Sequence, residues 1–515
     1  MASVCADPVR MRALTLAAAL VAPQAALAGV TAEEAWEVWT VQFEALGLDW
    51  EAEVLREGDA LAVGPIGLTR AFPYLGAELY LQLPGPRFAP GGDGIDVSLP
   101  ESAAMPFRLE MEVAGDMEVV AQGAFRWRME DATVGMRQDD AGIATQWTGA
   151  AFEIALDTFE MDGTPYPVSY RYLQSGFDIT QTSDITEGWL DFVRTGAAAQ
   201  VVVDYGYGEE TAGEGMRGAM ERNDVETVTE LRLPRDGSML NRMEAASDSG
   251  AVFRHDARAA TGTDWDREWL SGAPMGSSRT EWNDIRGQFV VTGEGLSVVS
   301  ESQSAAMQLT DPVMQVAAEL EADRVFLDLS IPLIRAVAPQ DYALRLELDQ
   351  FTLSEESWAQ FFLTDDLPRE AADIVVDLNG EMILLETLFD LRALSALSDD
   401  SLPLSVETLE LKALELRLPD ASVTGHGNLS FDHTDYETLE GFPVTEGQAT
   451  FEVSGAQGLL DRMLAAGALT DDDAVSARMT LGMFTDPVDG DPGRVRSEIS
   501  ITADGQVTVN GQRVR

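Results

Sequence analysis

Alternation of apolar and polar residues with a period of two is the feature that most constrains this chain. It is clearest at residues 107–113 and 344–349, where Phe, Leu or Met alternates with Arg, Glu or Asp. Successive side chains of a strand point to opposite faces of a sheet, so these segments are expected to be strands with one solvated face. Lys412-Ala413 shifts the phase of another such segment by one residue, which predicts a β-bulge or a break in the strand. The further alternating segments are 152–156, 325–331 and 409–418.

Helical patterns are few. Thr31 and Glu34 have the spacing of a capping box, and the aromatic residues that follow recur at helical spacing until Gly47. The polar side of this segment is acidic rather than basic, so we expect its aromatic side to pack in a core and not on a membrane surface. The apolar residues in question are Trp36, Trp39, Phe43 and Leu46.

Four other segments have helical spacing, and Thr470 is expected to cap a fifth, short helix whose positive end faces Asp471, Asp472 and Asp473. The four are marked by Ser354 with Trp358, Phe361 and Phe362; by Leu385, Leu388, Phe389 and Leu394; by Leu460, Met463 and Leu464 ending near Gly467; and by Asp184 and Glu187 with Ile185, Trp189 and Phe192.

The end of the chain has the pattern of a tight hairpin. Ile499 and Ile501 precede Asp504-Gly505, and Val507 and Val509 follow it before Asn510-Gly511. Asp-Gly readily adopts the positive φ angles of such turns.

Because the helices interrupt the strands irregularly, a regular βαβ sheet is disfavoured. We predict a mainly β protein with α+β character, in which large curved antiparallel sheets carry a few covering helices and leave an open groove. Apolar periodicity fades at 206–223 and again at 245–280, which predicts loops there. The expected organisation is a signal peptide at 1–28, a β-rich lobe at 29–245, a linker at 246–280 and a second β-rich lobe at 281–515.

The first residues have the composition of a secretory signal. Arg10 and Arg12 precede an apolar run at 13–22, and Ala26-Leu27-Ala28 supplies the small residues that a signal peptidase recognises. We expect cleavage after Ala28 and a periplasmic product, with Met11 a more natural start than Met1. Cys5 lies upstream of the run, so the exported product would have no thiol. No apolar stretch is long enough for a transmembrane helix.

The charge balance argues against nucleic-acid binding. Asp and Glu number 88 against 34 Lys and Arg, the formal charge is −54, and Lys412 is the sole lysine. Such a chain has no basic patch for phosphate groups. Its 45% hydrophobic and 24% charged residues are ordinary globular values.

Familiar catalytic and cofactor motifs are absent from the sequence. There is no phosphate-binding loop, no Ser-x-x-Lys pair, no Gly-x-Ser-x-Gly elbow and no His-Glu-x-x-His. The histidines are His255, His426 and His433. The last two are seven residues apart, so in a regular strand they would point to opposite faces and not share a metal. No catalytic, cofactor-binding or metal-binding residue is therefore assigned, and no cofactor is expected.

The acidic turns of the sequence are the remaining candidates for a calcium site. Asp486, Asp489 and Asp491 surround Gly490, but the twelve-residue register of an EF-hand is missing. A solvated turn is the simpler interpretation. Acidic residues are so abundant that paired carboxylates for glycoside hydrolysis cannot be singled out.

Several motifs resemble a known family. Leu367-Pro368-Arg369, Asp377-Leu378-Asn379-Gly380, the helix near Leu460–Leu464 and the closing hairpin are similar to the bacterial family named domain of unknown function 2125, over most of the mature chain. The resemblance implies an exported alphaproteobacterial protein without an assigned activity, so no functional residue is transferred. Thr424-Gly425-His426-Gly427 is similar in style to the AsmA-like envelope proteins, whose curved sheets form lipid-handling grooves, which is a likeness at the level of fold only.

The leading hypothesis is a non-enzymatic periplasmic envelope protein that binds or shields a lipid-like ligand, or a partner protein of the envelope, in a β-sheet groove. One alternative is a periplasmic hydrolase with an unrecognised carboxylate site. Another is an outer-membrane β-barrel, which the short strands expected from the pattern and the ending Arg513-Val514-Arg515 disfavour.

Overall fold

The computed structural model describes residues 29–92, 94–237, 250–314, 316–361, 370–388, 402–439 and 441–514. The predicted signal peptide, with Cys5 and the cleavage point at Ala28, lies outside the described residues. The chain forms two compact units. The first comprises Met1–Ala273 with Val290–Gly293, and the second comprises Pro274–Phe289 with Glu294–Arg515. One boundary between the units, at Ala273/Pro274, falls within the predicted region 245–280, and the other two, at 289/290 and 293/294, lie beyond it.

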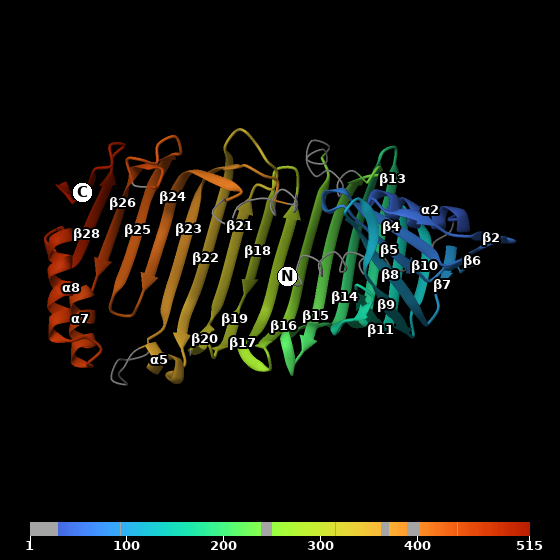
Figure 1. The fold of residues 1–515 in the computed structure, drawn as a ribbon, viewed down its shortest axis with the longest axis horizontal. Coiled ribbons are helices and arrows are strands. Elements are labelled where there is room, and N and C mark those ends of the chain that lie inside the picture. The colour runs from blue at the N-terminus through green and yellow to red at the C-terminus, as the bar shows by residue number, and fades with distance from the viewer. Residues whose placement is uncertain are drawn as a thin grey trace. The chain divides into compact units, whose positions relative to one another are not determined.

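The predicted fold class is confirmed: 68% of the structure is strand and 10% is helix, in a large antiparallel sheet. The first unit contains a series of long strands in which each strand pairs with the next (Figure 1). These are β11 (Gly142–Met161), β13 (Val168–Thr186), β14 (Trp189–Glu209), β15 (Ala212–Pro234) and β16 (Val252–Leu270).

The loops predicted at 206–223 and 246–280 are wrong where the structure describes them. Residues 212–234 and 252–270 are strands, and β17 (Ala273–Val291) follows. The glycines there serve packing: a Cβ on Gly215 would lie 2.3 Å from the ring of Trp269, and one on Gly218 would lie 2.6 Å from the ring of Tyr205. Small residues in β15 thus make room for aromatic neighbours, and the strands are longer than the apolar pattern alone indicated.

The helix predicted at Asp184 and Glu187 is also wrong. Strand β13 ends at Thr186 and β14 begins at Trp189, with Gly188 at φ 89° in the turn between them. Leu190 and Phe192 therefore alternate along a strand, and the ladder pairs Ile185 with Leu190. Pairing and packing between the two strands therefore determine the structure here, and the local capping pattern does not.

Strand β11 supports two branches along one of its edges. Its first half pairs with β10 (Thr133–Asp139), which leads to β7 (Gly94–Ser98), β6 (Arg87–Gly91), β3 (Ala60–Val63) and β2 (Val54–Glu57). Its second half pairs with β9 (Asp116–Glu130), which leads to β8 (Ser102–Val113), β5 (Ala77–Leu83), β4 (Ile66–Phe72) and β1 (Asp49–Glu51). A one-turn 3-10 helix η1 (Pro73–Leu75) and the short strand β12 (Thr164–Pro165) complete this part.

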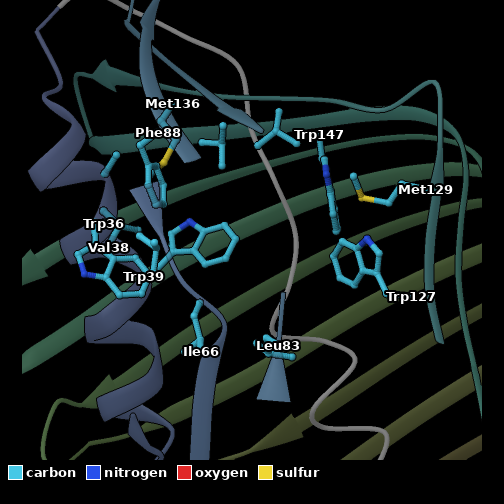
Figure 2. Close-up of a cluster of buried hydrophobic side chains, with 14 of the residues drawn as sticks. Trp36, Val38, Trp39, Ile66, Leu83, Phe88, Trp127, Met129, Met136 and Trp147 are labelled. Carbon is cyan, nitrogen blue, oxygen red and sulfur yellow. The ribbon is translucent and has the colours of Figure 1, made fainter. Parts of the chain in front are cut away.

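Helix α2 (Ala32–Ala45) begins with the predicted capping box of Thr31 and Glu34, and Gly47 follows its end at φ 64°. Trp36 and Trp39 are buried in the core (Figure 2). Phe43 is buried too, which confirms core packing of this side of the helix. The ring of Phe88 from β6 lies 6.0 Å from that of Trp36 and 5.8 Å from that of Trp39. One cluster joins this helix to residues of both branches, such as Met136 of β10 and Trp127 of β9. The first unit therefore has a closed core.

The second unit is a succession of antiparallel strands. One series runs β18 (Leu296–Ser302), β21 (Arg324–Ile331), β22 (Gln340–Leu353), β23 (Ala372–Leu384), β24 (Leu404–Arg417), β25 (Ser422–Asp432), β26 (Val444–Ser454) and β28 (Asp491–Ile501). A second runs from β17 through β19 (Ser304–Asp311) to β20 (Val316–Ala322), which also pairs with the end of β22. Strands β27 (Asp486–Val488), β29 (Val507–Val509) and β30 (Gln512–Arg513) flank or follow β28.

Local predictions for this unit are largely confirmed. The register of β23 with β24 skips Lys412, which is the predicted bulge. The closing hairpin pairs β28 with β29, with Gly505 at φ 77° in its turn. Among the described residues of this unit, the helices are α5 (Glu355–Phe361), α7 (Ala456–Ala465) with Gly467 beyond its end, and α8 (Asp471–Phe484). Leu385 and Leu388 are not helical, whereas Phe362, Phe389 and Leu394 lie outside the described residues.

Within the described part of the chain, no helix combines the length and apolarity needed to cross a membrane.

Candidate functional site

The apolar residues of the second unit align across its sheet because the strands are paired in register. Val325 of β21 faces Leu348 of β22, Leu348 faces Ile374 of β23, and Ile374 faces Leu416 of β24. Parallel rows continue to β26. We call this surface the apolar face: Val325, Leu327, Leu329, Leu344, Leu346, Leu348, Ile374, Val376, Leu378, Leu409, Leu411, Leu414, Leu416, Val423, Leu429, Phe451 and Val453.

None of these residues is buried. Leu416 is 36% exposed, whereas Trp127 and Phe88 in the core of the first unit are 0% exposed. Val375 and Val376 are neighbours on opposite faces of β23, and both are partly exposed. Both faces of β23 are thus partly accessible to solvent, and a partly exposed apolar surface of this size is unusual.

The opposite surface, here the polar face, carries a network of ion pairs. Arg324 donates to Glu301 at 2.7 Å and to Glu347 at 2.5 Å, and Arg345 donates to Glu347 at 2.6 Å and to Asp377 at 2.9 Å. Burial alone would raise the pKa of Glu347, but the hydrogen bonds from Arg324 and Arg345 outweigh it and lower that pKa. This ion-pair network therefore lies on the face opposite the aligned apolar side chains.

Glycines of β25 shape the apolar face. A Cβ on Gly425 would lie 2.5 Å from the ring of Phe451 on β26, and one on Gly427 would lie 2.6 Å from the carbonyl oxygen of Gln448. The Thr424-Gly425-His426-Gly427 motif therefore has a packing role, because Gly425 leaves the space that the ring of Phe451 occupies.

The histidines have separate surroundings. His426 is exposed in β25, while His433 follows that strand, with Nδ1 2.9 Å from Tyr436 Oη and Nε2 2.8 Å from the carbonyl oxygen of Val406. His255 of β16 lies in the first unit, where its Nδ1 is 2.9 Å from Thr229 Oγ1 and burial lowers its pKa. Each is accounted for by local hydrogen bonding or exposure.

The acidic clusters of the sequence form local structure: one caps a helix and the other makes a turn. Thr470 and Asp473 form a capping box at the start of α8, as expected, with Asp471 and Asp472 in its first turn. Asp489 and Gly490, both at positive φ, make the turn between β27 and β28. Among the residues that the structure describes, no group of three or more His, Cys, Asp or Glu is arranged to hold a metal ion.

One polar cluster in the first unit was not predicted from the sequence. Arg194 on β14 donates from Nε and Nη2 to Gln181 Oε1 on β13, at 3.1 and 2.8 Å. Burial lowers the pKa of Arg194 to about 10 and raises that of nearby Tyr172 to about 12. The available signal was an arginine that continues the alternation of Leu190 and Phe192 on the inward side of a strand.

Comparison with known proteins supports the family resemblance for the second part of the chain. Residues 273–514 match the family described as "Uncharacterized protein conserved in bacteria (DUF2125)". This confirms the resemblance over those residues, a shorter span than the sequence analysis expected. The search of curated proteins found no match.

A solved structure that aligns with the chain is the crystal structure of BauA, the ferric preacinetobactin receptor from Acinetobacter baumannii. It is 7% identical, the alignment covers 90% of this chain and 78% of the receptor, and the TM-score is 0.15. A score this low carries no argument about fold or function.

Proposed function

We propose that this chain, whose C-terminal part belongs to an uncharacterised bacterial family, is a non-enzymatic envelope protein that holds acyl chains on its apolar face. One observation carries the proposal: six neighbouring strands, β21 to β26, present aligned Leu, Val, Ile and Phe side chains that remain partly exposed. A surface of this kind marks a binding site far more often than a free solvent boundary.

Acyl chains suit this surface energetically. Each methylene group moved out of water contributes about 0.8 kcal/mol, so about ten methylenes would supply on the order of 8 kcal/mol before entropy losses. The described side chains that define the apolar face are uncharged, and the ion pairs of Arg324 and Arg345 lie on the polar face. The ligand should therefore be recognised by its hydrocarbon part.

We place the protein in the periplasm, after removal of residues 1–28. The support is the arrangement of Arg10, Arg12, the apolar run and Ala26-Leu27-Ala28. Fractionation of the native host followed by N-terminal sequencing tests this. A mature protein that begins at Gly29 in the periplasmic fraction is expected, and a cytoplasmic protein with an intact leader would refute it.

Lipid binding is tested on the purified protein. We expect organic extraction and mass spectrometry to find co-purifying acyl lipids, and we expect a fluorescent fatty acid to bind in solution. Val376→Asn on the apolar face should weaken that binding about tenfold, which corresponds to about 1.4 kcal/mol.

Val375→Asn is the matched control, because the same substitution is made one residue away on the polar face. It should leave fatty-acid binding unchanged. Equal effects of the two variants, or no bound amphiphile in repeated preparations, would refute acyl-chain binding at this surface.

A further inference from the structure

Several large apolar side chains that protrude into solvent are gathered at one end of the second unit's sheet. Val337 is 96% exposed, Phe442 72%, Leu402 70% and Leu385 47%. They lie in the described parts of the connections between β21 and β22 (332–339), between β23 and β24 (385–388 and 402–403), and between β25 and β26 (433–439 and 441–443). Because β21 to β26 are paired antiparallel in that order, alternate connections lie at the same end of the sheet.

Hydrogen bonds join the described parts of the first two connections to each other and the third to a neighbouring strand. Ala336 N donates to the carbonyl oxygen of Leu384 at 3.2 Å, and Leu388 N donates to that of Leu333 at 3.0 Å. Leu385 N donates to the carbonyl oxygen of Pro403 at 2.8 Å. His433 links the third connection to β24 through the carbonyl oxygen of Val406. The side chains are thus carried on one connected rim, which adjoins the end of the apolar face at Leu409 and Leu429.

The charges of this rim indicate the partner. Exposed carboxylates lie on the same connections or on the adjoining ends of their strands, whereas Arg335 is paired with Glu386 at 3.8 Å. An anionic surface would be repelled by such a rim, while a neutral one would not. The exposed acidic residues are Asp341, Glu381, Asp432 and Glu437.

We propose that this rim inserts its apolar tips into the surface of a neutral or zwitterionic lipid bilayer. Insertion of Val337, Leu402 and Phe442 would bring the open end of the apolar face to the membrane, where acyl chains are available. Interfacial binding of this type grows with the apolar area inserted and does not need a membrane-spanning helix. The inference goes beyond acyl-chain binding, since it assigns a docking surface and an orientation.

The opposite end of the sheet supplies a matched control. Val313 and Met314 are 64% and 73% exposed in the turn between β19 and β20. Strands β20 and β21 pair with consecutive parts of β22, so this turn lies at the end away from the rim. Its apolar exposure is similar but its position is different.

Co-flotation of the full purified chain with phosphatidylcholine vesicles tests the proposal. We expect the wild type and the Val313→Ser/Met314→Ser variant to float equally, and the Val337→Ser/Leu402→Ser/Phe442→Ser variant to float at least tenfold less. A Phe442→Trp variant should show a blue shift of the added fluorescence when vesicles are present. Vesicles with added phosphatidylglycerol should bind less than phosphatidylcholine alone.

Absence of wild-type flotation would overturn the inference and leave the rim as a surface for a protein partner. Equal losses in both serine variants, or stronger binding to anionic vesicles, would overturn it too. Fatty-acid binding in solution separates the two proposals. The rim variant should keep that binding, so failed flotation with intact fatty-acid binding refutes only the membrane contact, and the reverse result refutes only the ligand site.

Discussion

The first unit and the second use the same kind of strand but treat its apolar side differently. In the first, α2 and two branches of strands enclose Trp36, Phe88 and Trp127, which are 0–8% exposed (Figure 2). In the second, rows of Leu and Val across β21 to β26 stay partly exposed. Period-two alternation therefore defines an apolar face, but a second layer decides whether that face becomes a core or a binding surface.

The largest expected effect is in the closed core. Phe88→Ala should destabilise the first unit by about 3–5 kcal/mol, because it leaves a cavity between the rings of Trp36 and Trp39 that the sheet cannot collapse to fill. Urea unfolding followed by tryptophan fluorescence measures this. Phe442→Ala, at a 72% exposed position, is the control and should shift the midpoint little. Comparable losses would show that the two sites are packed alike.

A substitution on the apolar face should lower the free energy of unfolding much less than Phe88→Ala does. We expect Leu346→Ala to lower the unfolding free energy by about 1 kcal/mol, since its side chain is only partly removed from water. The same variant should bind fatty acids more weakly. Circular dichroism during urea unfolding gives the first value and fluorescence titration gives the second. A loss as large as that of Phe88→Ala would mean that the apolar face is packed as a core.

Helix caps provide a third comparison. Thr31→Ala removes the capping box of buried α2, and Thr470→Ala removes that of the mostly exposed α8. Each cap is worth about 1 kcal/mol locally, but only the loss at α2 should be transmitted to a core. The midpoint temperature of thermal unfolding should therefore fall clearly for Thr31→Ala and only a little for Thr470→Ala. Thr31→Ser keeps a capping hydroxyl and should restore wild-type behaviour.

The smallest effect concerns pH. The folded state lowers the pKa of Glu347 from 4.5, so its ion pairs contribute stability that is present above pH 4.5 and is lost as pH falls through the lowered value. Glu347→Gln should therefore show a shallower loss of stability on acidification below pH 4.5 than the wild type. Urea midpoints at several pH values measure the slope. Identical slopes would show that the polar-face network contributes nothing to acid sensitivity.

Local chemistry made several elements predictable. Thr31 with Glu34, Thr470 with its aspartates, the bulge at Lys412 and the Asp504-Gly505 hairpin are each defined by a few adjacent residues, and each is present. The sequence-based predictions were wrong where residues far away in the sequence determine the local structure. Gly215 and Gly218 lie in a strand because Trp269 and Tyr205 occupy the space that a side chain would take, and Asp184 lies in a strand because neighbouring strands extend past it.

The sequence by itself determined that the second unit would have one apolar and one charged side, because alternation along a strand assigns each side chain to a face. Only the tertiary structure decided that this apolar side stays open, that Arg194 is held against Gln181, and that Val337, Leu402 and Phe442 share one rim. Burial depends on which segments, often hundreds of residues apart in the sequence, pack against each other, and a local sequence pattern does not contain that information.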